Sequence, residues 1–215
     1  MIIGISGFIG SGKGTVGDYL VKEQGWKSVS FANSLKDAVS HIFCWPRHLL
    51  EGDTKESREW REVEDTWWSN KLGKPVTPRW VLQYVGTDVL RNHFNDRIWL
   101  LSVEKQISDY QGNVVITDVR FKNEMKMLQS MPNAYSVWVR KGQLPDWYHT
   151  AEAANSATFT HAPECAEAMY KLGIHNSEWD WVGQPIDYTI YNDGSLGDLY
   201  QKVDQMIYDL NNDNY

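Results

Sequence analysis

The stretch "GFIGSGKGT", residues 7–15, carries the residue types and the spacing that bind phosphate groups. A glycine-rich turn between a strand and a helix lets consecutive backbone N–H groups point at phosphate oxygens, and a lysine there adds a positive charge for the β- and γ-phosphates. Gly7, Gly12 and Lys13 fit the pattern G-x-x-x-x-G-K-[ST], whereas residue 14 is glycine and the hydroxyl follows at Thr15. Since an apolar strand precedes and a helical pattern follows, we interpret the stretch as an intact phosphate-binding loop.

A second group of charged residues lies in "VVITDVRFKNE". Asp118 ends an apolar strand, where phosphate-loop proteins place the carboxylate that positions Mg²⁺ or a substrate hydroxyl. Arg120 follows within reach of a phosphate, and Glu124 lies one helical turn further on. The alternative is an Asp–Arg pair that only fixes a loop, because structural ion pairs also gather at strand ends.

A third group lies in "TPRWVLQYVGTD". Arg79 falls in the first turn of a predicted helix, where a cation opposes the helix dipole unless an anion binds there. Gly86 in mid-helix costs about 1 kcal/mol relative to alanine, which indicates close approach of a ligand or of another segment, and Thr87 offers a hydroxyl beside it. Tight helix packing is the alternative for Gly86. Among the 11 tryptophans we single out Trp99 as a surface on which a base could stack.

Hydrophobic periodicity predicts strands and helices that alternate along the chain. Strands are expected at 1–6, 27–31, 113–118, 134–140 and 186–192, and helices at 14–24, 33–43, 77–94, 95–107, 121–129 and 195–210. Predicted helix starts use Asn33 or Ser34 as N-cap, Thr77 with Pro78, and Ser195 with Asp198 as a capping box. This order predicts an α/β fold, a parallel sheet with helices on both faces and ligands at the carboxyl ends of its strands.

Two stretches without a sustained period, 44–76 and 141–185, are too long for ordinary connections. We expect one domain over 1–215 with these two stretches as binding and lid insertions. The second stretch contains scattered side chains that could ligate a metal, but their spacing is not that of a metal site, so we interpret them as solvent-facing lid residues. They are His149, Glu152, His161, Cys165, His175 and Glu178.

Composition narrows the classes of function. The net charge of −7 argues against binding to nucleic acid polymers, which needs a basic surface, but allows a single nucleotide. The two cysteines form no disulfide framework, and neither a signal peptide nor a membrane span is recognisable. We therefore expect a cytoplasmic protein without membrane or nucleic acid partners.

With these pieces in place, the chain resembles the deoxynucleoside monophosphate kinases of tailed bacteriophages. The shared stretches follow the family's order and include "SGFIGSGKGTVGDYL", "FANSLKDAV", "RWVLQYVGTDVLRNHF", "RIWL", "VVITDVRFKNEM", "VWVRKG", "HNSEW" and "YNDGSLGDLYQKV". The loop form "GKGT" is similar to that of adenylate kinases. The resemblance implies a three-layer P-loop kinase fold and transfer of the ATP γ-phosphoryl group, with Mg²⁺, to a deoxynucleoside monophosphate. It implies small-molecule nucleotides as partners, leaves a homodimer open, and implies the host cytoplasm if the chain is phage-encoded.

The resemblance also implies site residues. ATP phosphates would be held by Gly10, Ser11, Gly12, Lys13, Gly14 and Thr15, and the adenine would lie near the turn Asn192, Asp193 and Gly194. The monophosphate site would comprise Arg79, Gly86, Thr87, Trp99, Asp118, Arg120 and Glu124. Arg140, at the exit of a strand into the lid, would clamp a phosphate as the lid closes. The catalytic set would be Lys13, Arg79, Arg120, Arg140 and Asp118, and the metal ligands are left unassigned.

Other functions remain open at this point. The nearest alternative is another small-molecule P-loop kinase, such as one for dephospho-coenzyme A or for ribonucleoside monophosphates. A more distant one is an NTP hydrolase or switch, although "NKLG" at 70–73 lacks the aspartate of the guanine-reading N-K-x-D motif. The accepted bases, and whether Asp118 serves Mg²⁺ or the acceptor, are not decided by the residues.

Overall fold

The computed structural model describes residues 1–212. The chain divides into two compact units, Met1–Val29 with Tyr110–Tyr215 as unit 1 and Ser30–Asp109 as unit 2. Unit 1 therefore consists of two chain segments, and unit 2 is continuous in sequence. The prediction of one domain with insertions at 44–76 and 141–185 stays a prediction.

Unit 1 is built on a parallel sheet of five strands among the described residues. The strands are β1 (Ile2–Ser6), β2 (Lys27–Val29), β3 (Val114–Ile116), β4 (Ala134–Arg140) and β5 (Tyr188–Tyr191), in the order β2-β3-β1-β4-β5. β1 is central, with Ile3 opposite Val115 on one side and Tyr135 on the other. Since every pairing is parallel, all carboxyl ends lie at one edge, and the five predicted strands are confirmed.

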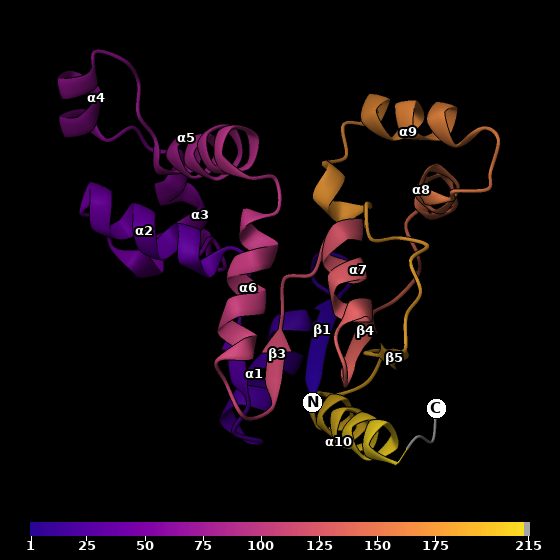
Figure 1. Ribbon diagram of the computed structural model, residues 1–215. Helices are drawn as coiled ribbons and strands as arrows, with labels where there is room; N and C mark the ends of the chain where they lie inside the picture. Colours follow the sequence, from indigo (N-terminus) through magenta and orange to yellow (C-terminus); the bar gives the residue numbers. More distant parts are fainter. Residues whose placement is uncertain (213–215) are drawn as a thin grey trace. The chain divides into compact units, whose positions relative to one another are not determined.

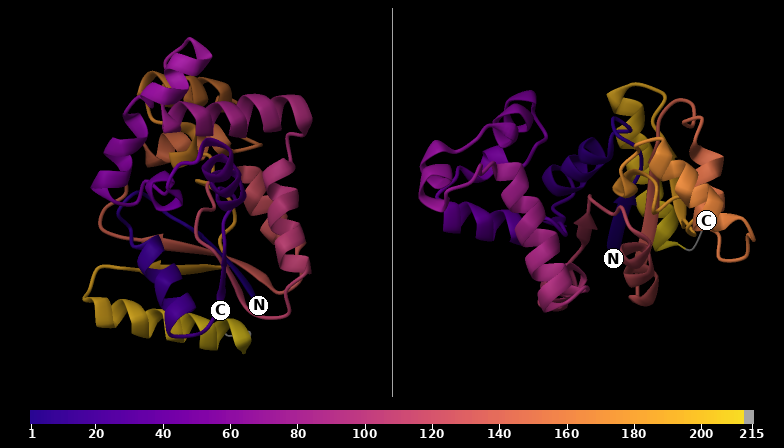
Figure 2. Two further views of the ribbon diagram at one scale, coloured as in Figure 1. Left: turned by 90° about the vertical axis from the view of Figure 1, so that its left-hand side faces the viewer. Right: turned by 90° about the horizontal axis from the view of Figure 1, so that it is seen from above.

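Helices cover both faces of this sheet (Figures 1 and 2). On one face, α1 (Lys13–Lys22) and α10 (Leu196–Asn211) pack their apolar residues around Ile3 and Ile5 of β1. On the other face lies α7 (Lys122–Ser130), where Gly4 leaves room for Leu128 because a Cβ at Gly4 would overlap that side chain. The predicted three-layer α/β fold is thus confirmed.

The polar stretch 141–185 contains helices, in contrast to its expected irregularity. These are α8 (Tyr148–Asn155), α9 (Ala162–Lys171) and the short 3-10 helix η3 (Asn176–Glu178). α8 and α9 pack against each other, and each buries one fully enclosed side chain, Ala151 and Met169. With one buried residue in each helix and mostly alanine among the other apolar positions, no strong hydrophobic period is visible in the sequence.

All the regular secondary structure in the described residues of unit 2 is helical. Its elements are α2 (Asn33–Phe43), η1 (Arg47–Leu50), α3 (Lys55–Glu62), α4 (Thr66–Leu72), α5 (Pro78–Gln83), the π-helix η2 (Tyr84–Phe94) and α6 (Ile98–Ser108). The expectation of irregular structure over 44–76 is wrong, because three short helices form there. Two of the three start at side-chain caps, Thr54 for α3 and Asp65 for α4, and each ends after about two turns or fewer, too soon for a period to repeat.

Predicted helix starts are confirmed at Thr77 and Ser195 but not in α2. Thr77 accepts a hydrogen bond from Trp80 N, and Ser195 forms its capping box with Asp198. In α2 the N-cap is Ala32, without a side-chain cap. The two polar candidates are used in tertiary contacts instead: Asn33 accepts from Arg47, and Ser34 bonds to Ser102.

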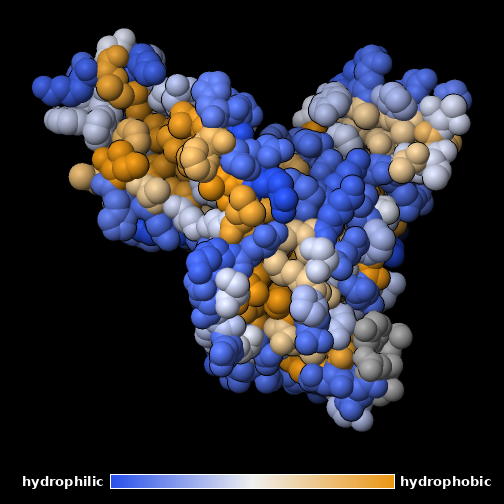
Figure 3. Space-filling model, viewed as in Figure 1, coloured by the Kyte–Doolittle hydropathy of each residue, from blue (hydrophilic) through white to orange (hydrophobic). Residues whose placement is uncertain are grey.

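The core of unit 2 is a cluster around Val39, Trp45, Leu50, Val76 and Val81. Figure 3 shows hydrophobic residues at the surface of unit 2. On α4 the large side chains of Trp67 and Leu72 are exposed. Within residues 1–212, every helix is too short or too polar to cross a membrane.

Candidate active site

The phosphate loop joins the end of β1 to the start of α1 and relies on left-handed backbone. Gly7, Gly10 and Gly12 have φ of 148°, 77° and 103°. A Cβ at Gly12 would lie 2.5 Å from Asn192 Nδ2, so this position needs glycine both for its φ and for its space. Gly12 is the N-cap of α1 and makes no side-chain cap bond. The first-turn N–H groups of a helix starting this way suit a bound anion.

Lys13 lies folded back over this loop. Its Nζ donates to the carbonyl oxygens of Gly7 at 2.6 Å and Phe8 at 2.9 Å. Burial lowers the pKa of Lys13 to about 8; nearby Arg120 lowers it further, and Glu178 partly offsets both. A desolvated lysine beside an arginine concentrates positive charge, and that charge suits phosphate groups.

The turn after β3 presents Asp118 and Arg120 at the same sheet edge. Asp118 is half-buried and Arg120 is exposed. Glu124, only 3% exposed, accepts hydrogen bonds through Oε2 from the N–H of Arg120 at 2.7 Å and of Phe121 at 3.0 Å. Glu124, predicted as part of the substrate site, therefore holds the turn that carries Arg120.

The predicted adenine turn is tied to the phosphate loop. Asn192 donates through Nδ2 to Ser11 O at 2.8 Å, and its own N–H donates to Arg140 O at 2.7 Å. Asp193 Oδ1 accepts from Gly142 N at 2.7 Å. The turn fixes both the loop and the exit of β4, a supporting role that sequence reasoning missed.

Arg140 ends β4, as predicted, and lies between two aromatic rings. Its guanidinium carbon is 5.6 Å from the ring centroids of both Trp138 and Tyr191. Stacked contacts of this kind orient a guanidinium and leave its N–H edge available for an anion.

Phe8 of the phosphate loop packs into an aromatic cluster formed by β4 and by the 141–185 stretch. Its ring centroid lies 5.2 Å from Trp181, 5.3 Å from Trp147, 6.2 Å from Tyr148 and 6.3 Å from Trp138. We call these five residues the Phe8 cluster. It ties the 141–185 stretch to the phosphate loop, and nothing in the local sequence signals it.

A second tie runs from the same stretch to α7. Asp180 Oδ2 accepts from Lys122 N, the first residue of α7, at 2.8 Å. Asn155 fastens the segment around Asp180 by donating from Nδ2 to the carbonyls of Trp179, Asp180 and Val182. Asp180 is therefore another supporting residue, 58 positions from its partner, which sequence spacing cannot reveal.

The predicted site residues of unit 2 differ from one another in solvent exposure: two are exposed and two are buried. Arg79 is 50% exposed and pairs with Glu62 at 3.1 Å, whereas Thr87 is exposed. Gly86 packs against Leu35, to which an added Cβ would come within 2.7 Å. Trp99 is only 8% exposed and donates from Nε1 to Gly86 O at 3.1 Å. The Trp99 indole anchors the π-helix in the interior, so its placement argues for support of the site and not for a stacking surface.

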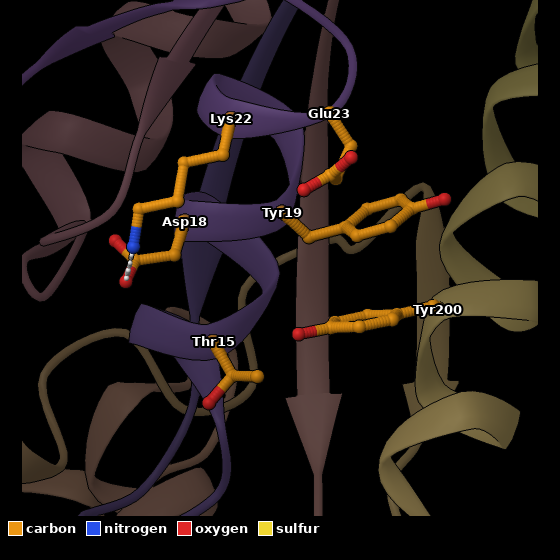
Figure 4. A pocket seen from close by; sticks show the side chains of 6 residues that line it. All are labelled: Thr15, Asp18, Tyr19, Lys22, Glu23 and Tyr200. Carbon is orange, nitrogen blue, oxygen red and sulfur yellow. Dashed lines mark hydrogen bonds and ion pairs between the residues drawn. The ribbon is translucent and has the colours of Figure 1, made fainter.

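A surface pocket lies between α1 and α10 (Figure 4). Tyr19 and Tyr200 stack there with centroids 4.2 Å apart, and Lys22 pairs with Asp18 at 3.0 Å. Of the predicted site residues only Thr15 lines it. The pocket thus lies along α1, and two of its charged residues, Asp18 and Lys22, pair with each other.

The histidines of the 141–185 stretch form local pairs. His149 lies 3.3 Å from Glu152, and His161 lies 3.4 Å from Glu164, each one helical turn away. Within residues 1–212 no three His, Cys, Asp or Glu side chains gather as a metal site.

A parallel sheet of this strand order, with a phosphate loop directly after its central strand, defines a P-loop kinase fold. The sequence profile of the deoxynucleotide monophosphate kinases matches residues 48–203, more than two thirds of the chain. The chain belongs to the deoxynucleotide monophosphate kinase family. It is therefore an enzyme, a phosphotransferase that acts on nucleotides.

Two viral relatives agree with this assignment. A protein of Acanthamoeba polyphaga mimivirus is 31% identical over 166 residues, which cover 71% of this chain and 80% of the viral protein. The deoxynucleoside-5'-monophosphate kinase of Escherichia phage T5 is 28% identical over 182 residues, covering 60% of this chain and 72% of the phage protein. Among solved structures, shikimate kinase from Aquifex aeolicus aligns with 97% of this chain and 96% of its own, at 12% identity and a TM-score of 0.45.

Proposed function

We propose that the protein transfers the γ-phosphoryl group of ATP to a deoxynucleoside monophosphate, giving ADP and a deoxynucleoside diphosphate. The observation that carries the proposal is the desolvated Lys13 on a left-handed glycine loop, with Arg120 near enough to lower its pKa. In the reaction the bond from the γ-phosphorus to the β,γ-bridging oxygen breaks, and an oxygen of the acceptor phosphate forms the new bond. That oxygen is already deprotonated near pH 7, so no general base is required.

The phosphate loop fits the phosphates of the donor. Ser11 Oγ is buried and has no hydrogen-bond partner among the described residues, which is costly unless a ligand oxygen completes it. The loop from Gly10 to Thr15 would hold the phosphates by its N–H groups, with Lys13 Nζ exchanging the carbonyls of Gly7 and Phe8 for phosphate oxygens. Asn192, Asp193 and Gly194 would border the adenine.

Arginines would hold the acceptor and the transferring group. Arg120 is held at its backbone by Glu124, which aims it at the sheet edge where ligands of parallel sheets bind. Arg79 of unit 2 would grip the acceptor phosphate as a bidentate partner in place of Glu62. Arg140 would meet the charge that spreads over the transferring group, oriented by Trp138 and Tyr191.

Residues Gly86, Thr87 and Trp99 would complete the acceptor site, with Trp99 shaping it through Gly86. The donor set also fits Mg²⁺, which takes one or two protein oxygens besides substrate phosphates, and Asp118 or Thr15 would supply them. When bound, the ion would neutralise charge on the β- and γ-phosphates. A homodimer and a cytoplasmic location stay predictions.

The test is release of ADP from ATP and Mg²⁺ with each of dAMP, dGMP, dTMP, dCMP and their ribose counterparts. We expect activity that requires a deoxynucleotide and falls at least about 100-fold in Lys13→Met, because a charge on the transferring group loses its partner. The control is Lys22→Met on the same helix, whose lysine is exposed and pairs with Asp18. Equal ADP release with and without acceptor would instead indicate a hydrolase.

A further inference from the structure

Arg61 of unit 2 is placed in an unusual way for a charged side chain. It lies in the last turn of α3, half-buried, and its guanidinium rests against the α-carbon of Gly52. A Cβ at Gly52 would overlap the guanidinium where it now lies, and the φ of 72° at this position favours glycine in any case. The guanidinium of Arg61 thus packs directly against the backbone of the loop before α3.

The guanidinium is not satisfied by the protein around it. Arg61 Nε is buried and has no hydrogen-bond partner among residues 1–212, and no carboxylate of this described part lies within ion-pair distance of Arg61. The nearby carboxylates are used elsewhere: Glu62 pairs with Arg79 at 3.1 Å, and Glu51 pairs with Lys36 at 2.6 Å and with Arg47.

Two arginines and two carboxylates lie close enough to Arg61 to act on its charge, and the largest influence after burial is that of Arg79. Burial, followed by the charge of Arg79, holds the pKa of Arg61 below its usual value; Arg58 acts in the same direction, and Glu62 and Glu51 only partly oppose them. A half-buried cation without a partner costs free energy, and neighbouring cations add to that cost. An anion that binds there would remove both costs.

A simpler reading is that Arg61 only stabilises α3, because a cation in the last turn favours the helix dipole. That reading accounts for the charge. It does not account for the packing of the guanidinium on Gly52, for the buried Nε without a partner, or for the presence of a second arginine, Arg79, near Arg61. A planar fork of N–H donors is the arrangement that binds phosphate through two parallel hydrogen bonds.

We propose that Arg61, together with Arg79, forms the anion site of unit 2 and binds the dianionic phosphate of the nucleoside monophosphate acceptor. The inference rests on the proposed function and adds a residue that no motif marks. In this site Glu62 occupies Arg79 until the acceptor arrives, so Glu62 and the acceptor phosphate compete for the same guanidinium.

The experiment measures KM for the best deoxynucleoside monophosphate and KM for ATP in four variants. Arg61→Gln raises the acceptor KM about 10- to 100-fold, as expected for lost hydrogen bonds to a charged group, and leaves the ATP KM within about twofold. Arg61→Lys recovers part of the loss. Glu62→Gln lowers the acceptor KM, because it removes the competitor of the phosphate. Lys55→Gln is the matched control on α3, an exposed lysine that pairs with Glu59, and changes neither constant.

A measurement of the melting temperature distinguishes a variant that has lost anion binding from one that has lost its fold. We expect inorganic phosphate at high concentration to raise the melting temperature of the wild-type protein more than that of Arg61→Gln, since phosphate stabilises the state that binds it. An acceptor KM in Arg61→Gln within twofold of wild type, or an equal rise of both KM values, overturns the proposal. So does an acceptor KM that rises in Glu62→Gln.

The proposed function can fail separately. If no deoxynucleoside monophosphate accepts phosphate from ATP, calorimetric binding of the monophosphates still tests this site. Binding that Arg61→Gln weakens at least tenfold supports the anion site without the kinase reaction. Binding equal in both proteins, or absent in wild type, overturns the site as well.

Discussion

Both units contain aromatic clusters, but the two clusters serve different purposes. In unit 1 the Phe8 cluster surrounds the first variable residue of the phosphate loop. In unit 2, Phe43 stacks on Trp45 at 4.6 Å and contacts Trp68 at 4.8 Å, within a core that has no strands among its described residues. Aromatic residues thus support a ligand loop in one unit and replace a sheet as core in the other.

The polar edges of the two clusters differ as well. In unit 2 the indole N–H of Trp45 donates to Asp65 at 2.7 Å, and that of Trp68 donates to Phe43 O at 3.1 Å. In unit 1, Trp181 Nε1 donates to Glu178 O at 3.1 Å, whereas Trp138 Nε1 is buried without a hydrogen-bond partner in the described residues. A cluster whose indoles are all bonded is suited to holding a fold, whereas one buried indole N–H without a partner is suited to a site that changes on binding.

The largest expected difference comes from truncating the two phenylalanines. Phe8→Ala and Phe43→Ala should each lower the free energy of unfolding by about 2–3 kcal/mol, because each removes ring contacts from a half-buried cluster. Only Phe8→Ala should also raise KM for ATP, since only that ring positions the phosphate loop. Denaturant unfolding and steady-state kinetics measure the two effects.

A rise of KM for ATP in Phe43→Ala as large as in Phe8→Ala would remove the distinction between the clusters. Ile9→Ala, an exposed neighbour of Phe8, is the local control.

A smaller effect is expected from two glycines with positive φ, one in each unit. Gly12→Ala should destabilise the protein by about 2 kcal/mol, from left-handed strain and from overlap with Asn192, and should weaken nucleotide binding. Gly73, which ends α4 at φ of 66°, faces open space. Gly73→Ala should therefore cost about 1 kcal/mol and leave nucleotide binding unchanged. Chemical denaturation and ATP titration check both; equal effects on titration would contradict the prediction.

The contribution of a buried tryptophan to stability can be compared with that of an exposed one by making the same substitution at both positions in unit 2. Trp99→Phe should cost about 1–2 kcal/mol, because it keeps most of the ring but removes the hydrogen bond to Gly86 O. Trp67→Phe, at an exposed position, should change stability by less than about 0.5 kcal/mol. Thermal unfolding compares them, and a Trp67 effect as large as that of Trp99 would show that the buried bond contributes nothing special.

The smallest expected effect is the uptake of a fraction of a proton when ATP binds. Since the pKa of Lys13 is lowered to about 8, bound phosphates should raise it again, so ATP binding near pH 8.5 should take up a fraction of a proton. Between pH 8 and 10.5 the unfolded state holds more protons at this group than the folded state, so the stability of wild type relative to Lys13→Met should rise with pH. Calorimetry in buffers of different ionisation enthalpy measures the uptake. No uptake in wild type, or equal uptake in Lys13→Met, would refute a role for this lysine.

The sequence predicted the parts of the molecule whose geometry is local. Gly7, Gly12 and Lys13 are specified by turn and helix chemistry within a few residues, and the strands by apolar runs. The parts that depend on distant contacts could not be predicted. Asn192 reaches Ser11 across 181 positions, and the guanidinium of Arg61 rests on Gly52 with no pattern that links them.

At two places the sequence gives a local signal, but its physical cause or its detailed form is visible only in the structure. Glycine is unfavourable within a helix, so the sequence indicates a special role for Gly86, and the structure supplies two causes: packing on Leu35 and a hydrogen bond that Trp99 donates to its carbonyl. The helix of 77–94 was predicted as one element, whereas it becomes a π-helix at Tyr84. Widened turns of this kind depend on tertiary contacts, and hydrophobic periodicity does not resolve them.

The position of β1 at the centre of the sheet has a consequence for how the chain folds. Ile2 pairs with Val114 and Ala134, so the first strand has no neighbour until more than half of the chain is available. Residues 30–109 are continuous and can make their own contacts earlier, while the closing of so long a loop delays the sheet. During synthesis on the ribosome, β1 and the phosphate loop are therefore made before the two strands that flank β1, and the sheet around the loop can form only after those strands have been made.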